Sequence, residues 1–93
     1  MLSAHPFDWP MRRNKYEYLS SCQVADADRG PVARIYATHT FHTDSGGVTR
    51  VHSPHTYTVM WEWTDHEPIA LPITAQSFDD AMTEAQRVWD RIK

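Results

Sequence analysis

Residues 32–64 read VARIYATHTFHTDSGGVTRVHSPHTYTVMWEWT and contain two strand-like runs separated by a strong turn signal. β-branched and aromatic residues dominate both runs, and such residues favour strands. The intervening Asp44-Ser45-Gly46-Gly47 is typical of the turn in an antiparallel hairpin. We therefore expect strands over residues 32–43 and 48–64, joined by a turn at residues 44–47.

The side chains of both runs alternate, which assigns one face of the hairpin to the core. In the first run this face carries Ala33, Ile35, Ala37, His39 and Phe41, and in the second it carries Tyr57, Val59, Trp61 and Trp63. The opposite face is polar apart from Tyr36 and Met60, and it includes Glu62.

The expected pairing follows from the turn and from Pro54. Tight pairing across a four-residue turn would place His39 opposite His52 and Phe41 opposite Arg50. Pro54 has no N–H to donate, so a bulge or bend is expected there. One added residue near Pro54 would then place Ile35 beside Tyr57 and keep the apolar positions on one face.

The segment before the hairpin predicts one more strand. Residues 16–24 alternate with period two, and Tyr18, Cys22 and Val24 fall on the apolar side. Residues 25–31, ADADRGP, have the composition of a turn, in which Asp26 and Asp28 serve the turn geometry.

The segment after the hairpin predicts a short strand and a helix. Residues 65–68 break the strand, and residues 69–73 suggest a short edge strand limited by Pro68 and Pro72. Ser77 is a helix N-cap, with Asp80 as its partner in a capping-box-like pair. The helix, over residues 78–92, has an apolar stripe of Phe78, Ala81, Met82, Ala85, Val88, Trp89 and Ile92.

These elements predict an α+β fold, in which a three- to four-stranded antiparallel sheet packs against one C-terminal amphipathic helix. The 93 residues suffice for a single domain. We divide the chain into an irregular N-terminal arm, residues 1–14, and one domain over residues 15–93. Pro6 and Pro10 oppose regular structure in the arm, and its Phe7 and Trp9 are expected to pack on the domain. The expected core is Tyr18, Cys22, Ile35, Tyr57, Val59, Trp61, Phe78, Met82, Ala85 and Trp89.

Composition restricts the compartment and the class of partner. The only cysteine, Cys22, rules out an internal disulfide, which favours a reducing cytoplasmic location for so small a domain. No signal-peptide pattern opens the sequence, and no apolar run is long enough to span a membrane. The formal charge of −3 makes this a small acidic protein without the basic footprint of a nucleic-acid binder.

The sequence lacks the motifs of common enzymes and cofactor sites. It contains no G-x-G-x-x-G, G-K-[ST], G-x-S-x-G or H-E-x-x-H, so we expect neither catalysis nor a cofactor. Cys22, at an apolar strand position, is expected to be a buried structural thiol. His39, His42, His52 and His55 lie within 17 residues, which leaves a zinc site on the hairpin as one alternative. The expected register joins only His39 and His52, with His42 on the opposite face.

A sheet followed by a helix opening S-F-D-D-A resembles the arm-binding domains of tyrosine recombinases and the plant AP2-type domain. The resemblance covers residues 32–93 and rests on element order with Ser77, Phe78, Ala81 and Ala85. It implies a sheet face that enters the DNA major groove through basic and aromatic side chains. Glu62 and Met60 depart from that pattern, and Arg34 is the one arginine expected on the body of the sheet.

The remaining hypothesis is a non-catalytic protein-binding module. One version is a phage-type inhibitor, such as an anti-CRISPR protein, that occupies the nucleic-acid-binding surface of a host defence complex. The expected contact residues are on the hairpin and the polar sheet face: Tyr36, His42, Asp44, Arg50, His52, Met60 and Glu62. A nucleic-acid binder using Arg12, Arg13, Lys15 and Arg34 is the alternative. Exposed edges at residues 16–24 or 69–73 would also allow a homodimer.

Overall fold

The computed structural model describes residues 1–62 and 71–92 and contains one antiparallel sheet and one helix. The sheet order is β1-β3-β4-β5-β6, and β2 also pairs with β3. This confirms the predicted α+β architecture, a sheet packed against a C-terminal helix. The elements are β1 (Leu2–Ala4), β2 (Met11–Arg12), β3 (Tyr18–Asp26), β4 (Gly30–Thr43), β5 (Thr49–Trp61), β6 (Ile73–Ala75) and α1 (Phe78–Ile92).

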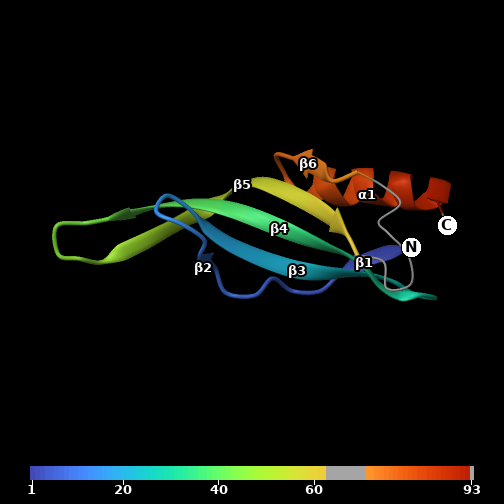
Figure 1. The fold of residues 1–93 in the computed structure, drawn as a ribbon, viewed down its shortest axis with the longest axis horizontal. Helices are drawn as coiled ribbons and strands as arrows, with labels where there is room; N and C mark the ends of the chain where they lie inside the picture. Colours follow the sequence, from blue (N-terminus) through green and yellow to red (C-terminus); the bar gives the residue numbers. More distant parts are fainter. Residues whose placement is uncertain (63–70, 93) are drawn as a thin grey trace.

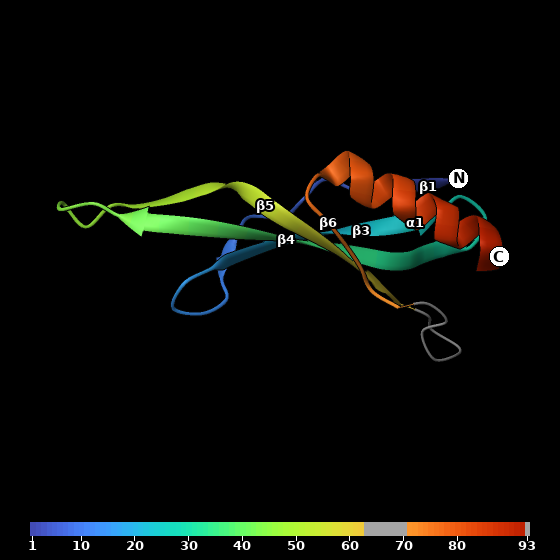
Figure 2. The same cartoon turned by 90° about the horizontal axis from the view of Figure 1, so that it is seen from above.

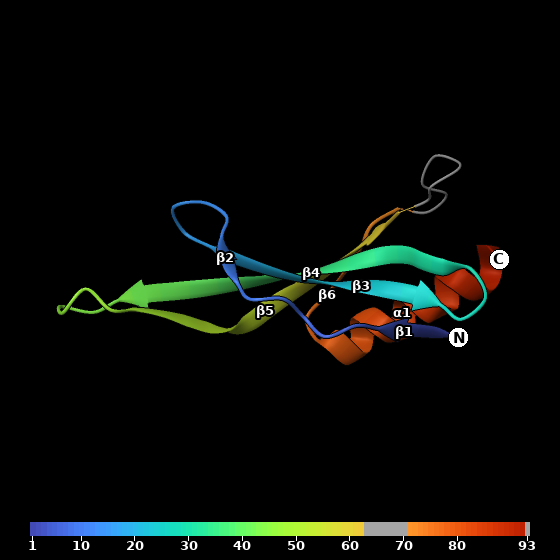
Figure 3. The ribbon, with the colours of Figure 1, turned by 90° about the horizontal axis from the view of Figure 1, so that it is seen from below.

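The molecule is elongated, with extents of 51 × 23 × 21 Å. Helix α1 covers one face of the sheet at one end, while β4 and β5 continue past the other end as a two-stranded ribbon (Figures 1 and 2). Seen from below, the opposite face of the sheet is turned to the viewer and the helix lies behind it (Figure 3). The sheet therefore has a covered face, an open face and a protruding ribbon, residues 40–53.

The N-terminal arm differs from the expected irregular segment because two parts of it pair with β3. Leu2, Ser3 and Ala4 pair with Asp26, Ala25 and Val24, and Met11 and Arg12 pair with Leu19 and Tyr18. Pro6 and Pro10 fall between and beside these pairs, where no ladder hydrogen bond is required of them. Three- and two-residue pairings of this kind leave no periodic signal in the sequence, so they could not be predicted from alternation.

The hairpin register also differs from the prediction. Its loop is one residue longer, because Thr43 pairs with Thr49, and Phe41 lies opposite Val51 and not Arg50. Two irregularities, between Thr38 and His39 and between His39 and Phe41, replace the single expected bulge. Ile35 consequently pairs with Val59 and not Tyr57. Each added residue in β5 reverses the side to which the following side chains point, so two added residues cancel. The apolar face is therefore as predicted, although the register is not.

The turn itself is stabilised by Asp44. Its carbonyl oxygen accepts from the N–H of Gly47 at 3.0 Å, and its Oδ1 accepts from the N–H groups of Gly46 and Val48. Gly47 has a φ of 83°, a conformation that only glycine adopts without strain. The predicted turn residues are therefore correct, and the extra loop residue is Val48.

The core lies between α1 and the covered face. Trp89, Ala81 and Ala85 of the helix pack on Ile35, Val59 and Trp61 of the sheet. The indoles of Trp61 and Trp89 stack at 6.2 Å with an interplanar angle of 12°. The predicted core is confirmed for Cys22, Ile35, Val59, Trp61, Ala85 and Trp89, which are buried, while Tyr57, Phe78 and Met82 are half-buried and pack against it. Tyr18 is half-buried outside this cluster, with its ring 5.1 Å from that of Phe41.

The helix begins and ends at the predicted residues. Ser77 Oγ accepts from the N–H of Asp80 at 3.1 Å, as an N-cap does. Trp63 and Thr64, the strand break at residues 65–68 and the start of the predicted edge strand at residues 69–70 lie outside the described residues. The described edge strand, β6, begins at Ile73, where the predicted one ends. Within the described part of the chain, no helix has the length and apolar character needed to cross a membrane.

Candidate functional site

The exposed indole of Trp9 marks the candidate site. Trp9 is 88% exposed, contrary to the expectation that it packs on the domain. Its neighbour Phe7 does pack, edge-on against Tyr57 and Phe78 at 6.2 and 5.7 Å between ring centroids. Trp9 matters as a candidate because this exposed indole adjoins a concave, mostly apolar surface.

The backbone on either side of Trp9 is fixed. Asp8 N–H donates to the carbonyl of Ser21 at 2.9 Å, and the Asp8 carboxylate accepts from the N–H and the hydroxyl of Ser21 at 2.8 and 3.2 Å. On the other side, Pro10 restricts Trp9 to extended geometry, and Met11 pairs with Leu19. The position of the Trp9 backbone is therefore set before any partner arrives.

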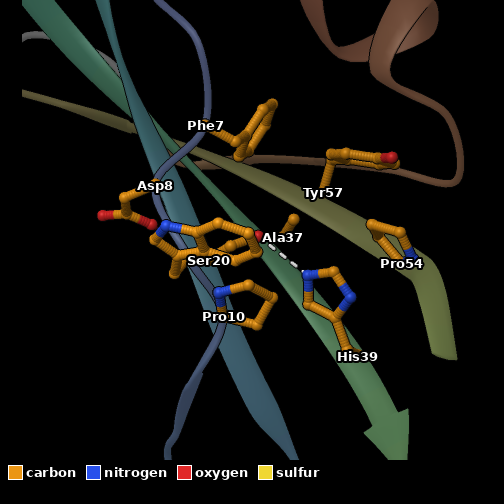
Figure 4. Close-up of a pocket in the computed structure, with 9 residues that line it drawn as sticks. Phe7, Asp8, Pro10, Ser20, Ala37, His39, Pro54 and Tyr57 are labelled. Atoms are coloured by element: carbon orange, nitrogen blue, oxygen red, sulfur yellow. Dashed lines mark hydrogen bonds between the residues drawn. The ribbon is translucent and has the colours of Figure 1, made fainter. Parts of the chain in front are cut away.

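Trp9 stands at a hollow of about 410 Å³ between the arm and β5, which we call the Trp9 hollow. Its floor is formed by β3 and β4 and its walls by the arm and β5 (Figure 4). Most of its lining is apolar, with a few polar groups, as in common ligand-binding pockets. The lining residues are Phe7, Asp8, Trp9, Pro10, Ser20, Ala37, His39, Pro54 and Tyr57.

The polar floor of the hollow is a buried pair, Ser20 and His39. The Ser20 hydroxyl lies 2.8 Å from His39 Nε2, as the dashed line in Figure 4 shows. His39 Nδ1 lies 2.8 Å from the carbonyl oxygen of His52. A carbonyl oxygen can only accept, so Nδ1 carries a hydrogen, and in the neutral ring Nε2 accepts from Ser20. With exposures of 5% and 6%, both side chains are buried and satisfied.

The hollow continues towards the ribbon as a groove of about 520 Å³. The groove shares Trp9, Pro10 and His39 with the hollow and adds Val51, His52 and Ser53. Val51 is 37% exposed. The arm, the floor of the sheet and the base of the ribbon thus contribute to one concave surface, and Trp9 belongs to both of its parts.

The structure divides the predicted contact residues between two places. His42, Asp44, Arg50 and His52 lie on the exposed ribbon. There, His42 Nδ1 and His52 Nε2 are 2.8 Å apart, which corrects the expectation that His42 faces away from His52. The shifted register is the reason, because it pairs His42 with Arg50 and leaves His52 on the same side. The hydrogen bond between His39 and His52 is made by the backbone carbonyl of His52 and not by its ring.

The other predicted residues are Tyr36, Met60 and Glu62. They alternate with buried core positions along β4 and at the end of β5, so they lie on the open face of the sheet. Tyr36 lines a smaller hollow of about 290 Å³ on the open face, with Arg13, Leu19, Thr38 and Thr58. Glu62 Oε1 lies 3.4 Å from Nε of Arg34, and Arg34 also donates to Ser21 Oγ at 3.2 Å. Arg34 on the open face therefore has protein partners.

Arg12 is also engaged within the protein. Its guanidinium lies 5.1 Å from the centre of the Phe41 ring, and it donates to the carbonyls of Asn14 and Lys15. Two members of the basic set proposed for nucleic acid, Arg12 and Arg34, thus already have contacts that a phosphate would have to replace.

Two other titratable groups have structural roles. Burial raises the pKa of the Cys22 thiol, which is 2% exposed, so the thiol is buried as predicted. The pKa of Asp26 is lowered by hydrogen bonds from the N–H of Asp28, from the indole of Trp89 and from the N–H of Arg29. Asp26 therefore serves the turn, as predicted, and also anchors the helix.

Neither a cluster of metal ligands in the described part of the chain nor a known relative assigns a function to the site. Among residues 1–62 and 71–92, no three side chains of His, Cys, Asp or Glu converge as metal ligands would. No family model, curated protein or solved structure matches this chain.

Sequence reasoning missed Trp9 and the Ser20–His39 pair. The proline on either side of Phe7-Asp8-Trp9 indicated an extended segment, but alternation places Phe7 and Trp9 on the same side of it, so nothing in the sequence indicated that one packs and the other is exposed. His39 occupied an apolar position in the strand pattern, which already indicated a buried histidine in need of a polar partner.

Proposed function

We propose that this chain is a non-catalytic protein-binding module whose partner docks on the Trp9 hollow and the adjoining groove. The observation that carries the proposal is Trp9, which is 88% exposed at the edge of an apolar concavity. Tryptophan is among the residues most enriched at the energetic centres of protein interfaces. An exposed indole on a fixed backbone offers a partner a large apolar contact.

The surroundings of Trp9 support the same function. Its backbone is held by Asp8 and by the pairing of β2, so little conformational entropy is lost there on binding. The groove adds Val51 and His52 from the ribbon, which gives an interface with an apolar centre and a polar margin. A protein partner fits this composition better than a phosphate backbone does.

The finer version of the proposal is an inhibitor. A small acidic chain without catalytic motifs could occupy the nucleic-acid-binding surface of a host defence complex in the cytoplasm, as a phage-type inhibitor would. Size, a formal charge of −3 and an exposed aromatic anchor support this version. The partner would then offer a basic surface next to an apolar pocket or ridge that receives Trp9.

The test is affinity capture from cells of the source organism, with the intact protein and two variants as baits. Trp9→Ala removes the proposed anchor, and Tyr16→Ala is the matched control, since Tyr16 is 71% exposed but does not line the hollow. We expect one stoichiometric protein partner that survives nuclease treatment, is retained by Tyr16→Ala and is lost with Trp9→Ala. Recovery of nucleic acid, or of proteins only without nuclease, would contradict the proposal.

A further inference from the structure

The exposed pair His42 and His52 on the ribbon has a geometry that goes beyond protein binding. The two side chains come from adjacent strands, β4 and β5, and their nitrogens Nδ1 and Nε2 are 2.8 Å apart. The ring centroids are 4.9 Å apart with an interplanar angle of 75°. Both residues are exposed, so the rings can turn and a solvated ion can reach them.

The nitrogen separation can be compared with that of two imidazoles on one metal ion. With metal–nitrogen bonds of about 2.0–2.1 Å, two nitrogens at a right angle are about 2.9 Å apart, whereas a tetrahedral angle separates them by about 3.3 Å. The observed 2.8 Å is the length of a hydrogen bond between the two rings, and it shows that both nitrogens are near enough to reach one ion. Right-angled ligands are typical of the square-planar and octahedral geometries of Cu²⁺ and Ni²⁺, and tetrahedral ligands of Zn²⁺.

We propose that His42 and His52 form a two-histidine chelate for a divalent transition-metal ion of the Cu²⁺ or Ni²⁺ type. The proton of the hydrogen bond between the two nitrogens moves through solvent to the other nitrogen of the same ring, so that both facing nitrogens carry a lone pair. A modest rotation of both rings directs the two lone pairs to the ion, and water completes its coordination. Cu²⁺ should bind most tightly, ahead of Ni²⁺ and Zn²⁺, as in the general stability order of these ions.

Such an ion would act as a cross-strand staple. Within the described residues, the ribbon strands pair only with each other. β3 begins at Tyr18, which lies opposite His39, and the pairing of β6 with β5 extends no nearer to the ribbon than Tyr57. A two-stranded ribbon is marginally stable in water. A metal bound to one histidine from each strand would order it, and the remaining coordination positions could accept a donor atom from another molecule.

The test is separate calorimetric titration of the intact protein with CuCl₂, NiCl₂ and ZnCl₂, without any other ligand. His42→Ala and His52→Ala should each weaken binding by at least about tenfold, because losing a ligand costs no less than losing a second-shell partner. The matched control is His55→Ala, which removes an exposed ribbon-proximal histidine that bonds Thr56 and lies outside the pair. This control should bind as the parent protein does.

A second measurement separates chelation from nonspecific binding. Amide hydrogen exchange in residues 40–53 should slow on metal addition in the parent protein and in His55→Ala, but not in His42→Ala. Circular dichroism would check that each variant is folded. Equal affinities in the parent and His42→Ala, an equal loss in His55→Ala, or tighter binding of Zn²⁺ than of Cu²⁺ would each overturn the proposal.

Discussion

The indole Nε1 of Trp89 donates a 2.7 Å hydrogen bond to Oδ2 of Asp26, a residue 63 positions earlier in the chain. The bond joins the last turns of α1 to the β3–β4 turn, whose N–H groups at Asp28 and Arg29 bind the other oxygen of the same carboxylate. One buried side chain, 7% exposed, therefore holds both the turn and the helix. The position of the helix on the sheet depends on this contact as well as on apolar packing.

The first prediction compares the two stacked tryptophans. Trp89→Phe leaves the Asp26 carboxylate without its indole donor, whereas Trp61 Nε1 is buried with no hydrogen-bond partner among the described residues. Removing a donor that has no partner changes the free energy of unfolding little, but leaving a buried acceptor without its donor is destabilising. We expect Trp89→Phe to lower Tm by several degrees more than Trp61→Phe, and Trp89→Ala to cost about 3–5 kcal/mol. Equal melting temperatures for the two Phe variants would show that the Asp26 bond contributes nothing.

The second prediction concerns stability against pH. The pKa of Asp26 is below its ordinary value of 3.8, first because of the hydrogen bond from Asp28 N–H and then because of that from Trp89. The unfolded chain therefore takes up a proton first as pH falls, so the contribution of Asp26 is complete above about pH 5 and is lost as pH falls through the folded-state pKa. Asp26→Asn should lower Tm at pH 7 and show a smaller decrease of Tm towards pH 2.

The control for this titration is Asp28→Asn, which removes an exposed neighbouring carboxylate and keeps the backbone donors of the turn. Thermal melts of the three proteins between pH 2 and pH 7 give the comparison. A pH dependence of Asp26→Asn that matches the parent protein would show that another group governs acid unfolding.

The third prediction is that the tip of the ribbon is functional surface and not part of the fold. Thr43 pairs with Thr49, so a two-residue Asn-Gly link in place of residues 44–48 can close the hairpin. Because the tip is exposed and makes hydrogen bonds only within its own turn, Tm should change by only a few degrees. The tip adds to the Trp9 hollow and the groove, whose lining does not include residues 44–48, so partner binding should weaken less than in Trp9→Ala. Unfolding of the shortened protein would mean that the tip is structural.

The fourth prediction follows from the proposal that the module is not an enzyme. Ser20 and His39 lie like a nucleophile and its base, but His39 is oriented by the His52 carbonyl and not by a carboxylate. Ser20 Oγ is also almost fully buried. A fluorophosphonate probe should therefore leave Ser20 unmodified, as measured by intact-mass spectrometry, with a Ser20→Ala variant as the background. Stoichiometric labelling of the parent protein alone would indicate a reactive serine.

The parts of the fold that could be predicted depend on residues close together in the sequence, whereas the hairpin register could not be predicted from local patterns. Helix α1 was predictable because Ser77 and the apolar stripe ending at Ile92 are encoded within one segment. The hairpin was predictable because Asp44 and Gly47 determine its turn within a few residues. Its register was not, because one extra loop residue, Val48, moves every later pair and alternation alone cannot detect it.

The candidate site was harder to predict because it depends on contacts between distant segments. The arm lies along β3 because Asp8 bonds Ser21, 13 positions later. No local sequence pattern indicates that these two residues are partners. The exposure of Trp9 ran against the general burial of aromatic residues, which holds on average and fails at binding surfaces. The ribbon residues were placed on the surface as predicted, although the pairing of His42 with His52 was not foreseen.

The affinity of the captured partner for the parent protein, Trp9→Ala and Tyr16→Ala tests the central claim most directly. Loss of an interface anchor costs about 2 kcal/mol or more, which corresponds to about a 30-fold rise in Kd. The account predicts that rise for Trp9→Ala, with unchanged Tm, and a Kd within about threefold of the parent for Tyr16→Ala. A parent-like Kd for Trp9→Ala would contradict it, and a loss confined to Met60→Ala would move the interface to the open face of the sheet.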